Sequence, residues 1–165
     1  MYKVIDDFLD KEDFIFINNL ILKEPFPWFY MDSYRETGLD KSKTNNFFYF
    51  LHMLYDNTVP NSPHYEPIIK CFFKKLKFKS LIRVKVNSYM KENSFVEHEM
   101  HTDYDYPNNG AVFSINTCNG YTKLEDGTKI NSVANRMVLF DASKPHCSTN
   151  TTDQPRRVNI NFNYF

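Results

Sequence analysis

The sequence predicts a mainly β protein with flanking helices, of the kind in which a sandwich or barrel is buttressed by helices on one side. Apolar residues recur at helical spacing in two segments of the first half, over residues 11–22 and 63–76. From residue 81 onward apolar and polar residues alternate, as in half-buried strands. Turn signals at residues 107–110, 119–120 and 126–127 divide this second half into short strands. Helices followed by many short strands are typical of such folds.

Length and composition indicate one folded domain over residues 1–165. A chain of 165 residues can bury a real core and is too short for two domains of typical size. It contains 16 Phe and 11 Tyr but only 4 Gly, which argues against disorder. Its 20 basic and 20 acidic residues cancel, which argues against a partner bound mainly through a basic surface. We therefore do not expect a nucleic acid as a partner.

The cysteines and the N-terminus bear on the compartment. Cys71, Cys118 and Cys147 are odd in number and form no C-x-x-C pair, so neither a disulfide framework nor a zinc ribbon is indicated. Acidic residues stand where a signal peptide would be basic, and no apolar stretch approaches the length of a membrane span. We expect a cytoplasmic protein without a membrane partner. A monomer is our default, with a homodimer as the alternative, because aromatic runs are more often core than interface.

The first half of the chain is predicted to hold two helices. Asp10 precedes the first as its N-cap, and Ser62 precedes the second, with Pro63 at the first helical position. The apolar stripes are Phe14, Ile17, Leu20 and Ile21 in the first helix, and Tyr65, Ile68, Ile69, Phe72, Phe73 and Leu76 in the second. We expect these stripes to cover a sheet.

The rest of the first half is less regular. Residues 26–30 are a short aromatic strand candidate. Residues 32–46 are polar, mixed in charge and without periodicity, which predicts a mobile loop and, as a hypothesis, a lid. His52 and His64 also fall in this half, and we expect both to be structural.

Alternation in the last strand separates two kinds of side chain. One face is polar and the other mainly apolar; they comprise Arg157, Asn159, Asn161 and Asn163 on one side, and Arg156, Val158, Ile160, Phe162 and Tyr164 on the other. The polar face fits either a solvent-exposed edge or a ligand cavity behind which the apolar face packs on helices. The strand at residues 82–90 alternates likewise, with Arg83, Lys85, Asn87 and Tyr89 opposite Ile82, Val84 and Val86.

The triplet His101-Thr102-Asp103 offers the chemistry of a metal site. On an extended strand, residues two apart point the same way, so His101 and Asp103 can present a ring nitrogen and a carboxylate oxygen to one ion. A second imidazole from a distant strand would complete a two-His-one-carboxylate face, which leaves three positions of an octahedral ion open. The triplet alone is weak support, because it arises often by chance.

The succession of segments that contains this triplet resembles a known family. The chain reads IRVKVNSYM, EHEMHTD, AVFSINTCNGYTKLEDGTKI, NRMVLFDASKPH and RRVNINFNYF, which is similar to the iron(II)- and 2-oxoglutarate-dependent oxygenases, particularly the small prolyl-hydroxylase-like members common in phage and bacterial genomes. The opening VIDDFLDKEDF also resembles the usual start of those proteins, so the resemblance covers most of the chain. It implies a distorted double-stranded β-helix, or jelly roll, with a helical buttress mainly in residues 1–80 and a metal-binding core mainly in residues 81–165. For a phage-encoded member, the compartment would be the host cytoplasm.

The resemblance also implies a set of metal ligands. Fe(II) would be held by His101, Asp103 and His146, the last of which lies in KPHCS after the apolar segment MVLF. His98 falls on the opposite strand face unless a bulge intervenes, so we expect it near the site and not among the ligands. Asp105 could compete with Asp103, but the H-x-D spacing favours Asp103.

The co-substrate is 2-oxoglutarate in the same family. The resemblance implies that Arg157 pairs with its distal carboxylate, and parity together with the pattern R-x-N-x-N favours Arg157 over Arg156. Asn159 shares that face and is a further candidate for co-substrate binding. Asn87 and Tyr89 could also hydrogen-bond the co-substrate, although a turn asparagine and a packed tyrosine explain them equally well.

The resemblance further implies the reaction. Oxygen would oxidatively decarboxylate 2-oxoglutarate to succinate and carbon dioxide while a C–H bond of the substrate is hydroxylated. The substrate would be a protein side chain such as proline, or a small molecule, and least of all a nucleic acid. The segment NGYTKLEDGTKI resembles the family's hairpin, in which a glycine lets backbone approach closely and Thr122 and Leu124 line the cavity; the family often has two glycines where Asn119-Gly120 stands here.

Two other classes of protein stay open. A zinc-dependent or cupin-like enzyme could use the same three ligands without 2-oxoglutarate, but Arg157 and the asparagine-lined strand argue against it. A non-catalytic jelly-roll binding module is the third class, and the intact ligand set argues against that. A metal-free protein without affinity for 2-oxoglutarate would favour the binding module.

Overall fold

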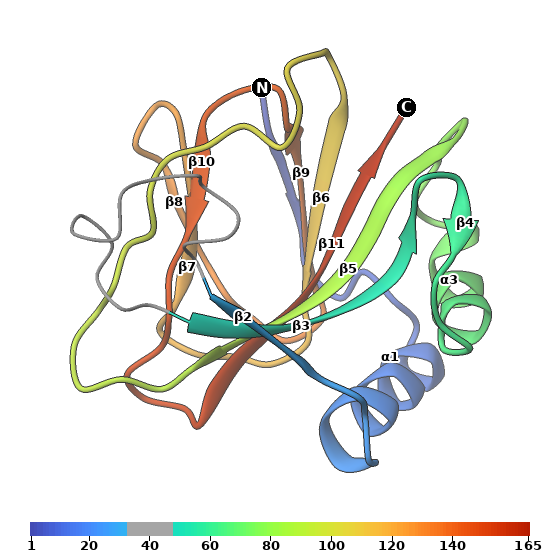
Figure 1. Ribbon diagram of the computed structural model, residues 1–165, viewed down its shortest axis with the longest axis horizontal. Helices are drawn as coiled ribbons and strands as arrows, with labels where there is room; N and C mark the ends of the chain where they lie inside the picture. Colours follow the sequence, from blue (N-terminus) through green and yellow to red (C-terminus); the bar gives the residue numbers. More distant parts are fainter. Residues whose placement is uncertain (33–47) are drawn as a thin grey trace.

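The computed structural model describes residues 1–32 and 48–165, which form two antiparallel sheets and a small helical layer (Figure 1). The predicted loop and lid at residues 32–46 lies outside the described residues, except for Asp32, which ends a strand. In chain order the elements are β1 (Lys3–Ile5), α1 (Lys11–Asn18), the π-helix η1 (Asn19–Lys23), β2 (Phe29–Asp32), β3 (Phe48–Asp56), β4 (Val59–Pro60), α3 (Tyr65–Phe73), β5 (Leu81–Met90), β6 (Asn109–Ser114), β7 (Tyr121–Leu124), β8 (Lys129–Asn131), β9 (Arg136–Asp141), β10 (His146–Ser148) and β11 (Arg156–Tyr164).

The strands build a jelly roll, as predicted. In the described part of the chain, the larger sheet runs β1-β9-β6-β11-β5-β3-β2, with β4 added beside β3, and the smaller sheet runs β10-β7-β8. Figure 1 shows the smaller sheet across from the centre of the larger one, so that β5, β6 and β11 face it over the interior. The mainly β architecture with flanking helices is therefore confirmed.

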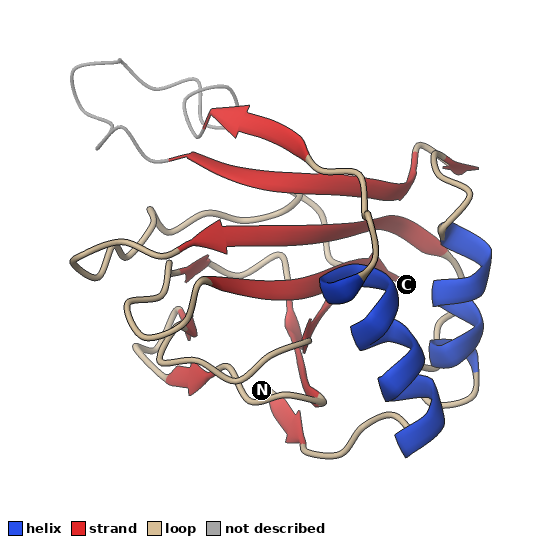
Figure 2. Cartoon of the chain, turned by 90° about the horizontal axis from the view of Figure 1, so that it is seen from below, coloured by secondary structure: helices blue, strands red, loops and turns tan. Residues whose placement is uncertain are grey.

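The helices cover the outer face of the larger sheet, on the side away from the smaller sheet (Figure 2). Phe72 of α3 is fully buried, and its ring centroid lies 5.0 Å from that of Phe113 in β6 and 4.9 Å from that of Phe162 in β11. Ile17 of α1 is fully buried in the same cluster. Full burial of one such side chain contributes about 1.5–3 kcal/mol, so each of them stabilises the packing of the helices on the sheet.

The starts of both helices differ in detail from the prediction. Asp10 is the N-cap of α1, but its side chain makes no capping hydrogen bond, because the carboxylate pairs instead with Lys75 Nζ at 2.6 Å. The second helix begins at Tyr65, because Ser62 and Pro63 belong to a preceding turn in which the Tyr65 N–H donates to Ser62 O at 3.1 Å. Phe73 was expected in the apolar stripe, yet it is 54% exposed at the edge of α3.

The first half also contributes four strands, β1 to β4, to the larger sheet. The predicted strand at residues 26–30 begins only at Phe29, because Pro27 has no N–H for a ladder and its carbonyl binds His52. His52 lies on β3 and is buried, with Nδ1 2.7 Å from Pro27 O and Nε2 2.7 Å from Ser62 Oγ. These two contacts make His52 a link between β3 and the segments that flank it.

Of two glycines in the predicted turns, Gly127 lies in a turn and Gly110 lies in a strand. Asp126-Gly127 is the predicted hairpin turn between β7 and β8, where Gly127 has a φ of 84°. Gly110, by contrast, lies inside β6, where an added Cβ would stand 2.8 Å from the Phe140 ring. Within the described ranges, no helix is long and apolar enough to cross a membrane.

Candidate active site

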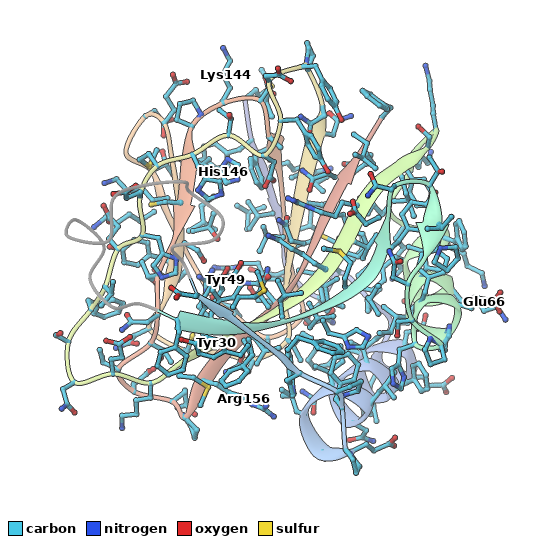
Figure 3. The ribbon with its side chains drawn as sticks, viewed as in Figure 1. Tyr30, Tyr49, Glu66, Lys144, His146 and Arg156 are labelled. Atoms are coloured by element: carbon cyan, nitrogen blue, oxygen red, sulfur yellow. The ribbon has the colours of Figure 1, made fainter. Side chains whose placement is uncertain are left out.

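The structure brings together the three side chains that the sequence singled out as metal ligands. His101 and Asp103 come from the β5–β6 connection, and His146 is the first residue of β10. One potential ligand atom from each lies within 4.8 Å of the other two. Among residues 1–32 and 48–165, no other group of three His, Cys, Asp or Glu side chains gathers in this way. In Figure 3 the His146 side chain points into the space between the two sheets.

Backbone hydrogen bonds fix the spacing of the cluster. The triplet suggested that His101 lies on an extended strand. In the structure His101 lies outside the regular strands and forms a single antiparallel bridge with His146. The His101 N–H donates to His146 O, and the His146 N–H donates to His101 O, both at 2.9 Å. The Asp103 N–H donates to Ala142 O at 3.2 Å. The connection is thereby attached to the edge of the smaller sheet, which holds ligands distant in sequence at short range.

Both imidazoles present the same nitrogen. His146 Nδ1 lies 2.9 Å from Lys144 O, and His101 Nδ1 lies 3.2 Å from Glu99 O. Because a carbonyl oxygen only accepts, Nδ1 carries the hydrogen and Nε2 keeps its lone pair. Although the residue as a whole is exposed, the surrounding protein desolvates its ring, and this desolvation together with the neighbouring His146 lowers the pKa of His101. Neutral imidazoles with a free Nε2 are the form that binds a metal.

Asp103 is held as a carboxylate. Burial by itself would raise its pKa, but the charge of Arg83 opposes burial, and the pKa lies well below its usual value. Arg83 Nη2 donates to Asp103 Oδ1 at 2.7 Å, and Asn163 Nδ2 donates to Oδ2 at 2.9 Å. His146 Nε2 lies 3.6 Å from Oδ2. Asp105, the competing carboxylate, is exposed and is not part of the cluster.

Arg157 lies deep in the same interior, with 1% of its surface exposed. Its Nε donates to Ser132 Oγ at 2.6 Å, and Nη2 donates to Thr122 Oγ1 at 3.0 Å. Nη1 donates to Ser148 Oγ and to Thr149 O. The guanidinium has five N–H groups, so one hydrogen on Nη2 has no acceptor in the described part of the chain.

No carboxylate among the described residues pairs with this buried cation. Burial lowers the pKa of Arg157, but a guanidinium keeps its charge at neutral pH. An unpaired buried charge is costly, and the hydroxyls of Thr122, Ser132 and Ser148, which accept from Arg157, have hydrogens left to donate. The residues around Arg157 therefore fit a carboxylate ligand.

Arg156 lies on the other face of β11. Its Nη2 donates to Leu22 O at 3.2 Å, and its guanidinium lies 5.7 Å from the centroid of the Trp28 ring. The parity argument thus predicted correctly that the two arginines face opposite sides of the sheet. Gly120 also behaves as expected for close approach, since an added Cβ would lie only 2.6 Å from Arg157 Cδ.

The remaining candidates line the interior near Arg157. Asn87 and Asn159 are opposite one another on β5 and β11, and Asn87 Nδ2 donates to Asn159 Oδ1 at 3.0 Å. The Tyr89 ring centroid lies 5.7 Å from the Arg157 guanidinium carbon. His98 packs against Tyr89 with ring centroids 5.2 Å apart, so it lies toward this interior and not on the opposite face. Burial and the charge of Arg157 lower the pKa of His98 to about 3.

Arg83 and Lys85 also lie in this interior. The alternation of the strand at residues 82–90 predicted the face on which they lie, but the sequence analysis assigned them no role. Arg83 binds Asp103, and Lys85 is buried, 8% exposed, in register with Asn161 of β11. With Arg157, the inner faces of β5 and β11 carry three cations, whereas Asp103 is the one carboxylate of the metal cluster. The strand alternation was the signal that could have drawn attention to them. Of these cations, Arg157 has no carboxylate partner among the described residues, and it therefore favours an anionic ligand.

Comparisons with known proteins agree with this geometry at the level of the fold. No protein-family model and no curated protein matches the chain. Among solved structures, an oxidoreductase of the 2OG-Fe(II) oxygenase family from Burkholderia pseudomallei aligns with a TM-score of 0.68, at 14% identity over 99% of this chain and 83% of that one. A prolyl hydroxylase from Trichoplax adhaerens, solved with a hypoxia inducible factor peptide fragment, gives 0.64 at 14% identity, over 99% of this chain and 83% of that one.

A third structure, the viral collagen prolyl hydroxylase of Paramecium Bursaria Chlorella virus-1 with 2OG, gives a TM-score of 0.57 at 15% identity, over 98% of this chain and 94% of that one. The chain thus has the fold of the 2-oxoglutarate- and iron(II)-dependent oxygenases. Several of the solved structures that share this fold with it are prolyl hydroxylases.

Proposed function

We propose that the protein is an iron(II)- and 2-oxoglutarate-dependent dioxygenase that hydroxylates a C–H bond of its substrate. The observation that carries the proposal is a combination on one inner surface: a His-Asp-His cluster within 4.8 Å, and a buried Arg157 to which the described residues supply no carboxylate. Together the two features match a divalent cation and an anionic co-substrate.

His101, Asp103 and His146 would hold the iron. Two neutral imidazoles and one carboxylate suit Fe(II), and they leave coordination positions for co-substrate and oxygen. When bound, the iron would supply the activation of O2 that couples conversion of 2-oxoglutarate to succinate and CO2 with hydroxylation of the substrate. The protein's own part is to fix the two Nε2 atoms through Lys144 O and Glu99 O.

Arg157 would hold the 5-carboxylate of 2-oxoglutarate. The free Nη2 hydrogen and the surrounding hydroxyls of Thr122 and Ser148 offer donors to one carboxylate, and a charge-assisted contact of this kind is stronger than a neutral one. Asn159, Asn87 and Tyr89 would line the co-substrate from the neighbouring strands. Burial of this end of the site excludes water from the co-substrate.

The substrate would be a protein side chain, as for prolyl hydroxylases, or a small molecule. His101 is exposed while His146 is buried, so solvent reaches the metal cluster at His101. The neighbouring Met100 is 41% exposed, which adds apolar surface next to His101. A structure with similar fold was solved with a bound peptide fragment, which supports a protein substrate for this chain.

The proposal is tested by an anaerobic titration of the metal-free protein with Fe(II) and then 2-oxoglutarate, followed by visible absorption. We expect a metal-to-ligand charge-transfer band in the wild-type protein and its loss in His146→Ala. Circular dichroism of the variant checks that it is folded. Folded wild-type protein that shows no band would contradict the proposal and would favour a jelly-roll protein that does not use 2-oxoglutarate.

A further inference from the structure

Arg83 makes a direct contact with a residue of the metal cluster. Its Nη2 lies 2.7 Å from Asp103 Oδ1 and 3.2 Å from Asn163 Oδ1, while Asn163 Nδ2 lies 2.9 Å from Asp103 Oδ2. The Asp103 side chain is 4% exposed and that of Arg83 18%, so water screens this pair poorly. An ion pair in this position changes both the geometry and the charge that a metal would meet.

We propose, resting on the function proposed above, that Arg83 is a positioning residue that acts on the metal through Asp103. Arg83 binds Oδ1, whereas Oδ2 accepts from the neutral Asn163 amide and faces His146 Nε2, so Oδ2 is the oxygen that would serve as the metal ligand. The carboxylate would then bind a metal through one oxygen, while Arg83 holds the other. Coordination positions that a two-oxygen contact would take stay available for co-substrate and oxygen.

The positive charge of Arg83 has a second consequence. Two neutral imidazoles and one carboxylate would reduce the charge of a divalent ion from +2 to +1. With Arg83 beside Asp103, the carboxylate charge is offset, and the ion, its three ligands and Arg83 together carry a charge of +2. Arg83 therefore weakens the binding of the cation and strengthens the binding of a dianionic co-substrate to the loaded site.

The position of the guanidinium is set by rigid elements. Arg83 lies on β5 directly opposite Asn163 of β11, and the central strands of the larger sheet hold both residues. The guanidinium carbon also lies 5.4 Å from the centroid of the Tyr104 ring, next in sequence to Asp103. The charge is therefore kept close to Asp103 and does not depend on a flexible surface side chain.

The test measures two dissociation constants in Arg83→Gln: Mn(II) by electron paramagnetic resonance, then 2-oxoglutarate by calorimetry on the Mn(II)-loaded protein. A single neighbouring charge changes the proton affinity of a group by about tenfold or more, and we expect an effect of about tenfold here. The variant should bind Mn(II) about tenfold more tightly and 2-oxoglutarate about tenfold more weakly. A merely structural role would weaken both.

Arg136→Gln is the matched control. Arg136 forms a similar ion pair, with Nε 2.6 Å from Asp6 Oδ1, and its side chain is 20% exposed, but it lies outside the metal cluster. Both constants should stay at wild-type values in this variant. Arg83→Lys retains the charge, so both of its constants should stay within about threefold of wild type. This variant tests the proposal even if Arg83→Gln does not fold.

The outcomes separate this inference from the proposed function. Wild-type protein that binds Mn(II) but not 2-oxoglutarate would overturn the proposed function and the inference with it. Wild-type protein that binds both, with Arg83→Gln weakened in both or changed in neither, would overturn the inference alone. A tenfold loss of both affinities in Arg83→Lys would do the same.

Discussion

The two faces of β11 are buried to a similar degree but differ in how their groups are satisfied. Val158, Ile160 and Phe162 are fully buried against α1, α3 and β6, in the cluster that stabilises the fold. Arg157 and Asn161 on the inner face are 1% and 8% exposed, yet the Asn161 Oδ1 has no partner in the described part of the chain, and Arg157 has no counterion there. Burial alone therefore does not separate a core face from a ligand face, whereas unsatisfied polarity does.

The largest effect should come from breaking the outer face. Phe162→Ala removes a fully buried ring that lies 4.9 Å from Phe72, and we expect the free energy of unfolding to fall by about 3–5 kcal/mol. Asn161→Ala, one position earlier on the inner face, removes an amide with an unpartnered oxygen and should cost less than about 1 kcal/mol. Urea unfolding of both variants measures the difference. Equal losses would show that the two faces contribute alike.

A second effect is the stabilisation that Mn(II) binding to the metal cluster should produce. Mn(II) at about a hundredfold excess over its Kd should raise the free energy of unfolding by about 2.7 kcal/mol, because it binds only the folded site. The increment should be the same in wild type and in Phe162→Ala, because the metal cluster and the outer core are separate. Urea unfolding with and without Mn(II) measures both increments. An increment smaller by about 1 kcal/mol or more in the variant would mean that the faces are energetically coupled.

The smallest effect concerns pH. The pKa of His98 is about 3 in the folded protein and near 6.5 in the unfolded chain, so between these values the unfolded chain binds more protons. Stability should therefore fall as the pH is lowered from 7 to 5, and His98 should account for about 1–2 kcal/mol of that fall. His98→Gln should show a shallower decline in urea unfolding at the two values. An unchanged slope would mean that His98 is not desolvated beside Arg157.

The sequence was most informative where one strand alternates regularly. On β11, the alternation predicted that Arg157 and Arg156 lie on opposite faces, and the structure places them so. It was less informative where local signals competed. Ser62-Pro63 has the form of a helix start, but Ser62 Oγ lies 2.7 Å from His52 Nε2, and the residues form a turn instead. This contact joins segments ten residues apart, so helix-start signals do not reveal it.

In the candidate site, too, contacts between residues distant in sequence could not be predicted from local sequence signals. The approach of His146 to His101 depends on a single backbone bridge between a loop and β10, and only the resemblance to the oxygenases pointed to it. The pair Arg83 and Asp103 needs the register of β5 and β11 and the path of the β5–β6 connection at once. Composition and periodicity specify neither of these, because both are products of tertiary packing.

The central claim is that the inner face of β11 binds 2-oxoglutarate through Arg157, and calorimetry of 2-oxoglutarate binding to the Mn(II)-loaded protein tests it most directly. Arg157→Ala removes a buried charge-assisted contact worth about 2–3 kcal/mol and should weaken binding by about 30-fold to 150-fold. Arg156→Ala, on the opposite face, should leave the Kd within about threefold of wild type. Circular dichroism and the Mn(II) affinity check that each variant is folded. Folded Arg157→Ala protein that binds 2-oxoglutarate as tightly as wild type would contradict the claim.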